Sequence, residues 1–165
     1  MKYYLGIDNG VSGTIAILTQ EGGVRLFRKT PTKSEQSYTK TKKNITRIDV
    51  KNFLFLLKPY QDEQITVVLE RPMVNPKRFT ATLSAMRALE ATLCVLESLG
   101  IGLQYCDSKQ WQKEMLPKGV SGSPELKKAS LDISTRLFPE YTDTIKKHGD
   151  GDALLIAEWA RRHNL

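Results

Sequence analysis

Acidic residues stand at three points where an apolar segment of the 165-residue sequence ends or begins. Asp8 closes the segment YYLGID and is followed at once by Asn-Gly, while Glu70 closes ITVVLE and is followed by Arg-Pro. Asp152 stands at the start of the apolar segment DALLIAEWA. An Asn-Gly turn needs no acid before it, and a carboxylate at the end of a buried strand is costly unless it is paired. These positions indicate acids gathered round a cation, although Asp8 could instead be a side chain that caps the turn.

A divalent cation would relieve the repulsion between carboxylates that meet in one small volume. Mg²⁺ binds hard oxygen ligands, usually a few carboxylates together with water and substrate phosphate. Two such ions about 4 Å apart can activate a water on one side of a phosphate and stabilise the leaving oxygen on the other. The chemistry predicted for this site is therefore phosphodiester hydrolysis. The sequence contains neither a GxSxG motif nor a GxxxxGK[ST] phosphate-binding loop.

The residues just before Asp152 offer a further ligand. His148 precedes it by four positions and could reach the same side of the helix. Asp150 would point elsewhere if the helix has already begun, but it could turn inward as a cap. A simpler interpretation stays open, in which Asp150 is only an N-cap and Asp152 only interacts with the positive end of the helix dipole.

Length and composition are those of one ordinary globular domain, residues 1–165. Hydrophobic residues make up 40% of the chain, and no apolar run is expected to be long enough to cross a bilayer. The N-terminus MKYYLGID lacks the hydrophobic core of a signal peptide. The two cysteines, Cys94 and Cys106, form no CxxC pair and are interpreted as small buried residues in a reducing compartment. A cytoplasmic protein without a membrane partner is expected.

The formal charge of +7 is unevenly distributed along the chain. The stretch from Arg28 to Arg47 carries seven Lys or Arg residues against one acid, Glu35, and has almost no aliphatic residues. Because such a stretch cannot build a core, we expect an exposed loop or ribbon. Lysine and arginine contacts to phosphate supply most non-specific affinity for nucleic acid, so binding of a polyanion is predicted. A merely solvated run of charges is the alternative.

Five strands are expected to position the acids. The first three, Lys2–Asp8, Gly13–Thr19 and Val24–Lys29, are separated by Asn-Gly and Gly-Gly turns and predict an antiparallel meander. Ile65–Glu70 is a continuous apolar and β-branched run, which is typical of a central strand covered on both faces. The segment IGLQYC, which ends at Cys106, is the fifth strand.

Helices are expected between and after the later strands. One begins at Asp49, and a long one covers roughly Phe79–Leu99. Ser123 is the predicted N-cap of a third helix, and a fourth spans about Asp150–Arg162. This order predicts an α/β fold in which helices cover both faces of a mixed sheet. The long helix has a stripe assigned to the core and an alanine face that could let a second helix approach: Leu83, Met86, Leu89, Leu93 and Leu96 form the stripe, and Ala81, Ala85 and Ala88 the alanine face.

Five segments occur in the order found in the RuvC-like Holliday-junction resolvases: LGIDNGVSGTIAIL, VVLERP, DSKQWQKEMLP, SPELKKASLDISTRLFPE and HGDGDALLIAEWARR. The chain resembles a phage or bacterial member of that family over nearly its whole length, and least over Lys29–Arg47. The resemblance implies an RNase H-like fold, with strands 1–3 antiparallel and strands 4–5 parallel in a five-stranded sheet flanked by helices. It also implies a homodimer that makes paired nicks in four-way DNA junctions and depends on Mg²⁺ or Mn²⁺, with two ions per active site. The family's catalytic, metal-binding acids correspond to Asp8, Glu70 and Asp152.

The sequence departs from the family pattern at the fourth ligand. The bacterial pattern has an acid or a histidine three residues before the last aspartate, where this chain has Gly149. Relatives with a spacing longer by one residue place a ligand at the position of His148, which makes His148 the first candidate. Asp150 is the second. The coordination of one metal ion is therefore the open point of the resemblance.

The family also places lysines near the scissile phosphate, where they bind phosphate oxygens and offset the negative charge that develops in the transition state. The resemblance assigns Lys113 and Lys127 to this catalytic role, although Lys127 and Lys128 could equally be solvated helix charges. Met73, in the segment RPMVNP, matches the position at which family members insert an apolar side chain into the junction. The residues expected to contact DNA besides Met73 are Lys40, Lys42, Lys43, Arg47, Lys77, Arg78, Lys109 and Lys128.

Three other functions were weighed against junction resolution. A related nuclease that acts on other branched or flapped DNA, or on RNA–DNA hybrids, is the nearest alternative. A non-catalytic nucleic-acid-binding member of the RNase H-like group is the second, and the retention of three acids argues against it. Actin-like and sugar-kinase ATPases also open with an Asp-Gly turn, but they need two such lobes.

Trp111 and Trp159 lie beside apolar residues in helical segments and are interpreted as core rather than as base-stacking platforms.

Overall fold

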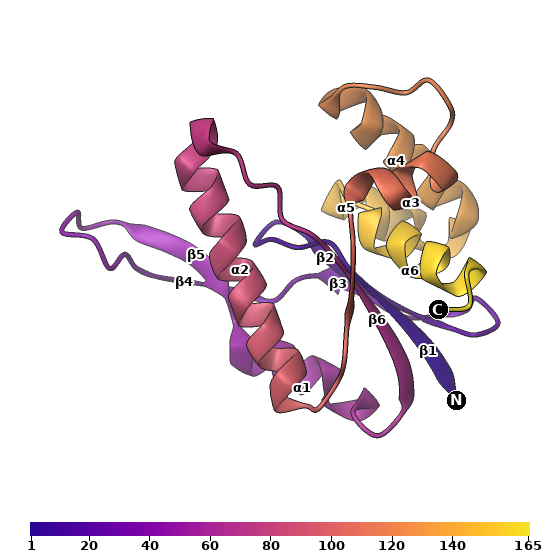
Figure 1. Ribbon diagram of the computed structural model, residues 1–165, viewed down its shortest axis with the longest axis horizontal. Helices are drawn as coiled ribbons and strands as arrows, with labels where there is room; N and C mark the ends of the chain where they lie inside the picture. Colours follow the sequence, from indigo (N-terminus) through magenta and orange to yellow (C-terminus); the bar gives the residue numbers. More distant parts are fainter.

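A five-stranded mixed sheet forms the centre of the computed structural model, which describes residues 1–165 (Figure 1). The strand order is β3-β2-β1-β6-β7, in which β1, β2 and β3 form an antiparallel meander while β6 and β7 run parallel to β1. This arrangement confirms the predicted α/β fold class. The last strand is shorter than the segment IGLQYC that was expected to form it. The strands are β1 (Lys2–Ile7), β2 (Thr14–Thr19), β3 (Val24–Lys29), β6 (Gln64–Glu70) and β7 (Gln104–Cys106).

Helices cover both faces of the sheet (Figure 1). Two of them, α1 and α2, pack on one face, and the other four pack on the opposite face. The predicted order of elements lacked α3 and α5, which have 8 and 7 residues, although Trp111 of α3 was placed in a helical segment. The helices are α1 (Val50–Leu57), α2 (Phe79–Ser98), α3 (Ser108–Met115), α4 (Ser123–Leu137), α5 (Thr142–His148) and α6 (Asp152–Arg162), and 3₁₀ turns occur at Lys58–Tyr60, Pro76–Arg78 and Pro139–Tyr141.

The alternation of side chains along β1 divides the core into two layers. Tyr3, Leu5 and Ile7 face α1 and α2 and belong to the larger apolar cluster. Tyr4 points to the opposite face, where it packs with residues of α3 and α6. Because successive residues of a strand point to opposite faces, Gly6 shares the α6 side with Tyr4, and the residue that follows β1 at the same phase is Asp8.

Gly6 permits α6 to lie directly against the sheet. A Cβ at this position would lie 2.6 Å from the Ala157 backbone nitrogen and still closer to the Ala153 carbonyl oxygen. The residues 153–158 of α6 are all buried. The absence of a side chain at Gly6 therefore sets the distance between β1 and α6, the two elements that carry Asp8 and Asp152.

The basic stretch forms an ordered β-hairpin outside the main sheet, the ribbon form of the expected loop or ribbon. Its strands, β4 (Thr32–Gln36) and β5 (Asn44–Ile48), pair antiparallel and project away from the body of the molecule (Figure 1). Glu35, the acid of this stretch, pairs with Lys33 at 2.5 Å and with Arg47 at 2.7 Å. Glu35 thus neutralises part of the positive charge on the two strands of the hairpin. The lysines of the connecting turn have no acidic partner.

The buried face of α2 differs in part from the predicted stripe. Leu96 is fully buried as expected, but Met86 is 40% exposed because the core-facing side of the helix runs through Ala88 and Val95. Cys94 is exposed, which corrects its interpretation as a buried residue, whereas Cys106 is buried as expected. The core-facing side of α2 is therefore rotated by part of a turn relative to the predicted stripe.

One stretch, Pro76–Ser98, is long and apolar enough by length and composition to cross a membrane, with a mean hydropathy of 1.3 over its best window. This corrects the expectation that no segment of the chain meets that criterion. In the structure, the C-terminal half of this stretch packs one side against α1 and the sheet. It is built into the same core as the strands.

The start of α4 also differs from the prediction. Ser123 is the first helical residue rather than the N-cap, and Gly122, with φ of 88°, precedes the helix without a side chain to cap it. Glu125 lies in the first turn, where a negative charge interacts favourably with the helix dipole. The predicted N-cap was therefore wrong by one position.

Candidate active site

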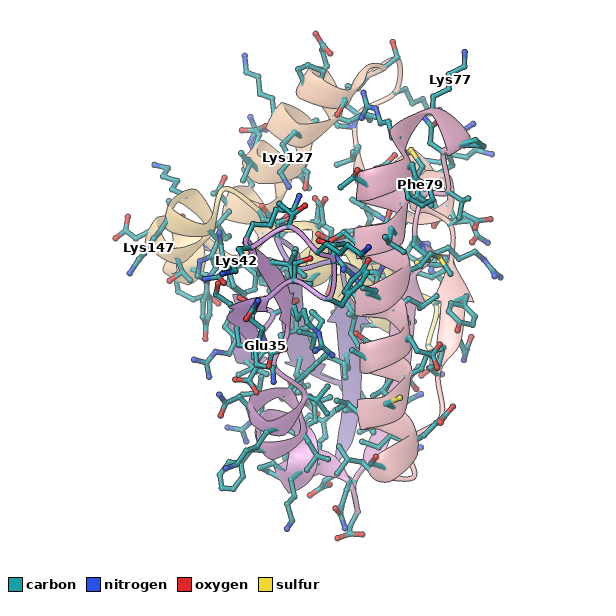
Figure 2. All side chains as sticks on the ribbon, turned by 90° about the vertical axis from the view of Figure 1, so that its left-hand side faces the viewer. Glu35, Lys42, Lys77, Phe79, Lys127 and Lys147 are labelled. Atoms are coloured by element: carbon teal, nitrogen blue, oxygen red, sulfur yellow. The ribbon has the colours of Figure 1, made fainter.

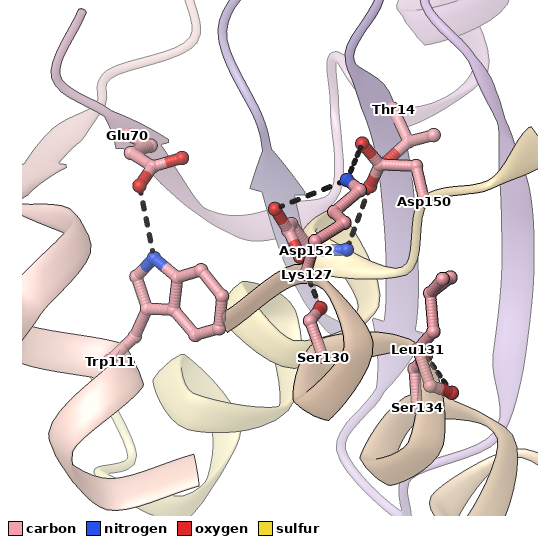
Figure 3. A network of polar contacts seen from close by, with 9 residues as sticks. All are labelled: Thr14, Glu70, Trp111, Lys127, Ser130, Leu131, Ser134, Asp150 and Asp152. Carbon is pink, nitrogen blue, oxygen red and sulfur yellow. Dashed lines mark hydrogen bonds and ion pairs between the residues drawn. The ribbon is translucent and has the colours of Figure 1, made fainter. Parts of the chain in front are cut away.

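Pairing between β1 and β6 places two of the acids side by side. Ile7 lies opposite Leu69 in the parallel register, so the next residues, Asp8 and Glu70, lie side by side at the end of the two strands. Glu70 accepts a hydrogen bond from the indole N–H of Trp111 at 3.3 Å (Figure 3). Trp111 is fully buried, as expected of a core residue, and its N–H additionally orients a site carboxylate.

The start of α6 brings two further acids to the same place. Asp152, the first residue of α6, accepts a hydrogen bond from the Ser130 hydroxyl (Figure 3). Asp150 is 6% exposed and accepts hydrogen bonds from the Thr14 hydroxyl at 3.0 Å and from the Asp152 backbone N–H at 2.9 Å. Asp150 thus turns inward and accepts from the first N–H of α6, whose N-cap residue is Gly151 rather than Asp150. Carboxylate oxygens of Asp8, Asp150 and Asp152 all lie within 4.8 Å of one another.

A single lysine neutralises part of this charge. Lys127 of α4 places its Nζ 2.8 Å from Asp150 Oδ2 and 3.7 Å from Asp152 Oδ2. Partial burial acts to lower the pKa of Lys127, but the negative charges of Asp152 and Asp150 outweigh it and raise the pKa above the usual lysine value. The side chain is therefore a full ammonium ion held among carboxylates.

The remaining acids carry more negative charge than their surroundings can balance. Burial raises the pKa of Asp8 well above its usual range, and the charges of Asp150 and Glu70 raise it further. Burial and then the charge of Asp152 raise the pKa of Glu70 to about 7, although hydrogen bonds with Asp8 and Trp111 oppose the shift. Burial and Asp150 also raise the pKa of Asp152. A cluster of this kind is stabilised in its ionised form when a cation binds.

The donor set fits a hard divalent cation. The carboxylates of Asp8, Asp150 and Asp152 converge within reach of one ion, and Glu70 stands next to Asp8. The cluster offers carboxylate oxygens and no thiolate, and oxygen ligands are those preferred by Mg²⁺ and Mn²⁺. These four residues could therefore hold such ions, with Glu70 and Asp8 on one side of the cluster and Asp150 and Asp152 on the other.

The acids form the floor of a polar cleft of 690 Å³ between the start of α2 and the start of α4. Two residues of the predicted alanine face, Ala81 and Ala85, border this cleft, and Ala88 is buried in the core. Asn9 donates a hydrogen bond from Nδ2 to the Ala85 carbonyl oxygen at 3.1 Å and so ties the turn after β1 to α2. Cationic side chains line the rim of the cleft: Arg71, Arg78, Lys109 and Lys127.

Three of the predicted catalytic or DNA-contacting residues lie away from the acids. His148 is the last residue of α5, and its ring packs against Phe27 of β3 with centroids 5.4 Å apart. The chain then reverses at Gly149, with φ of 63°, so Asp150 rather than His148 enters the cluster. Lys113, in the last turn of α3, and Lys128, on α4, are exposed and lie outside the lining of the cleft.

The other predicted DNA contacts fall into two groups on either side of the acids. Met73 is 77% exposed and lines the cleft together with Arg78 and Lys109. Figure 2 shows Lys77 and Phe79 at the beginning of α2, Lys127 on α4 and Lys42 on the projecting hairpin. The second group lies on the hairpin, where Lys40, Lys42 and Lys43 occupy the connection between the strands and Arg47 lies in β5.

Three polar residues of the site were not predicted from the sequence: Thr14, Ser130 and Asn9. Ser130 lies three positions after Lys127 on α4, a spacing that places both on one helix face and could have identified it. Thr14 opens β2 directly after the turn, at the end of the sheet where the acids lie. Nothing in the sequence identifies the hydrogen bond from Asn9 to α2, because it depends on tertiary packing.

The structure was compared with known proteins. No family model and no curated protein sequence matches the chain. A solved structure of Thermus thermophilus RuvC in complex with a Holliday junction substrate matches 98% of this chain and 94% of that chain, with a TM-score of 0.60 and 14% identity. The chain has a RuvC-like fold. A second structure, of Thermus thermophilus RuvC, matches 98% of this chain and 96% of that one at a TM-score of 0.55 and 16% identity. The RuvC-like fold thus extends over nearly the whole chain, whereas its sequence has diverged far from these two proteins.

Proposed function

We propose that this protein is a metal-dependent endonuclease that resolves four-way DNA junctions by paired phosphodiester hydrolysis. The observation that carries the proposal is the cluster of four acids on a RuvC-like fold, three of which, Asp8, Glu70 and Asp152, line a cleft together with cationic side chains. One of the solved structures with this fold is that of a RuvC in complex with a Holliday junction substrate. Such an activity would serve DNA recombination and repair in the cytoplasm of a bacterium or of a phage-infected cell.

The acids would hold one or two Mg²⁺ or Mn²⁺ ions. Asp8, Glu70 and Asp152 are the proposed ligands, with Asp150 ahead of His148 as the fourth because Asp150 lies within the cluster. The ions would supply activation of the attacking water and stabilisation of the leaving oxygen. Trp111 and Ser130 orient Glu70 and Asp152 by hydrogen bonds, so the ligands are fixed before DNA binds.

The cationic side chains would position the phosphate. Lys127 lies beside the acids and is the proposed partner of a non-bridging phosphate oxygen, where an ammonium ion offsets developing negative charge. Lys109 and Arg78 on the rim would bind the flanking backbone, and the exposed Met73 would enter the junction between the arms. Lys113 and Lys128 lie further out and would at most contact the backbone of a more distant part of an arm.

The hairpin would act as a second contact to an arm of the junction. The hairpin projects from the body of the molecule (Figure 1), and Figure 2 shows Lys42 on it. A junction is two-fold symmetric, and paired nicks require two active sites. We therefore propose a homodimer, as the family resemblance implies, in which each protomer supplies one cleft.

A nuclease for flaps or RNA–DNA hybrids would use the same acids, so the test is the choice of substrate. A mobile four-way junction, a matched duplex, a flap and an RNA–DNA hybrid are each incubated with Mg²⁺ and with EDTA. We expect symmetric nicks confined to the junction and only in the presence of Mg²⁺. Cleavage of the flap or the hybrid in preference to the junction would reassign the substrate, and tight binding of the junction without cleavage would indicate a non-catalytic protein.

A further inference from the structure

Both oxygens of the Asp150 carboxylate already have donors of the protein itself. Oδ1 accepts two hydrogen bonds, from the Thr14 hydroxyl and from the Asp152 backbone N–H, which fill its lone pairs. Oδ2 is paired with the Lys127 ammonium at 2.8 Å. A metal ion that used this carboxylate would therefore bind Oδ2, beside the ammonium.

The Lys127 ammonium lies among the acids, where a metal ion bound by Asp150 and Asp152 would also lie. Lys127 Nζ contacts Asp150 and lies 3.7 Å from Asp152 Oδ2, and both belong to the group whose oxygens lie within 4.8 Å of one another. Divalent ions bind carboxylate oxygens at about 2.1 Å, so an ion on Asp150 Oδ2 would lie within about 5 Å of the ammonium, and the two cations would repel each other. The ion and the ammonium therefore compete for the same carboxylate.

The other half of the cluster is different. Neither Asp8 nor Glu70 forms an ion pair with a lysine or an arginine, and burial and the charges of the neighbouring acids raise the pKa of both. The side chain of Lys127 is 41% exposed and faces the cleft, so its ammonium can leave the acids without disturbing the core.

We propose that Lys127 is an exchangeable counter-ion that occupies the Asp150–Asp152 side of the site until a metal ion and DNA displace it. The first ion binds on the Asp8–Glu70 side, which has no resident cation. A second ion binds at Asp150 only when the ammonium moves into the cleft, where a DNA phosphate receives it. This ordering rests on the metal site of the proposed function and adds to it the residue that controls how that site is filled.

The test measures metal binding in the absence of DNA and of any reaction. Mn²⁺ is titrated into the full chain by calorimetry, with free Mn²⁺ followed by electron paramagnetic resonance. We expect the wild type to bind one Mn²⁺ per chain and K127Q to bind a second, or to bind Mn²⁺ overall about tenfold more tightly. K127R retains a cation and should behave like the wild type. K128Q removes the same charge from the adjacent position of α4 and should also leave Mn²⁺ binding unchanged.

The outcomes separate this inference from the proposed function. Equal Mn²⁺ stoichiometry and affinity in K127Q and the wild type, or an equal gain in K128Q, would overturn the exchange. Failure of both the wild type and K127Q to bind Mn²⁺ would instead remove the metal site itself, and the exchange with it. Where K127Q folds poorly by circular dichroism, K127M retains the apolar stem of the side chain and is titrated in its place.

Discussion

At the residue scale, the site is built from acids that only tertiary structure brings together. Asp8 and Glu70 meet because β1 and β6 share a parallel register, and Asp152 joins them because Gly6 lets α6 lie against β1. Hydrogen bonds hold Glu70 and Asp152 in place, but Lys127 is the one cation paired with the acids, which leaves the cluster short of positive charge. The stability of the metal-free protein should therefore depend on how many of these acids are ionised.

Glu70→Gln should change the pH dependence of stability in the presence of EDTA. The folded chain retains the Glu70 proton up to a pKa of about 7, whereas the usual value in an unfolded chain is 4.5. Between these values the folded state binds more protons than the unfolded state, so the free energy of unfolding of the wild type falls as the pH rises. The variant lacks this contribution. Its stability relative to the wild type should rise between about pH 5 and pH 8, by roughly 1–2 kcal/mol.

Urea unfolding of both proteins at the two pH values measures this difference directly. Glu158 has a lowered pKa but lies outside the cluster and affects both proteins equally, so only the difference between the two proteins is compared. A difference in stability that stays constant from pH 5 to pH 8, within about 0.3 kcal/mol, would show that Glu70 is already ionised in the metal-free fold.

At the element scale, the distance between β1 and α6 is the central structural constraint. Gly6→Ala should destabilise the protein by at least about 2 kcal/mol, because the added Cβ would meet the backbone of α6 at Ala153 and Ala157. It should also reduce cleavage, since any shift of α6 separates Asp152 from Asp8. Urea unfolding and a cleavage assay measure the two effects. Gly102→Ala is the matched control, because no atom lies within 4 Å of a Cβ there; a loss of stability as large as that of Gly6→Ala would contradict this explanation.

The hairpin is the element that the proposed function needs for affinity rather than for chemistry. The triple variant K40Q/K42Q/K43Q should bind a junction more weakly and with a shallower dependence on salt, by about 0.9 in the logarithmic slope for each lost phosphate contact. Electrophoretic or fluorescence titrations over a range of salt concentrations measure this slope. The variant K51Q/K58Q, on and just after α1, removes charges outside the connecting turn of the hairpin and should leave the slope unchanged. An unchanged slope in the triple variant would exclude the hairpin from the DNA interface.

At the scale of the whole molecule, the sheet and the three acids Asp8, Glu70 and Asp152 were predictable from the sequence. Asp8 and Glu70 stand where an apolar strand ends, and Asp152 stands where an apolar helix begins. The choice between His148 and Asp150 was not predictable, because the left-handed turn at Gly149 decides which side chain faces the acids. The hydrogen bond from Asn9 to α2 depends on packing between distant segments and leaves no local pattern.

The polar partners of the acids were predictable from the sequence only in part. Ser130 and Lys127 share a helix face and form part of a readable pattern, but the pairing of Lys127 with Asp150 joins residues 23 positions apart. Trp111 has the apolar neighbours of a core residue, and its buried ring also bears the N–H that orients Glu70. A residue can therefore be assigned correctly to the core and still have a second role that only the structure places beside the site.

The central claim is that Asp8 is a metal ligand in a junction-cleaving site, and one side-by-side measurement tests it. Wild type and Asp8→Asn are compared for binding of a four-way junction in Ca²⁺ and for its cleavage in Mg²⁺. Asparagine keeps the shape of the side chain and removes its charge, so we expect junction binding within about threefold of the wild type and a loss of cleavage of at least about a thousandfold. Cleavage by Asp8→Asn at the rate of the wild type, with binding intact, would contradict the account.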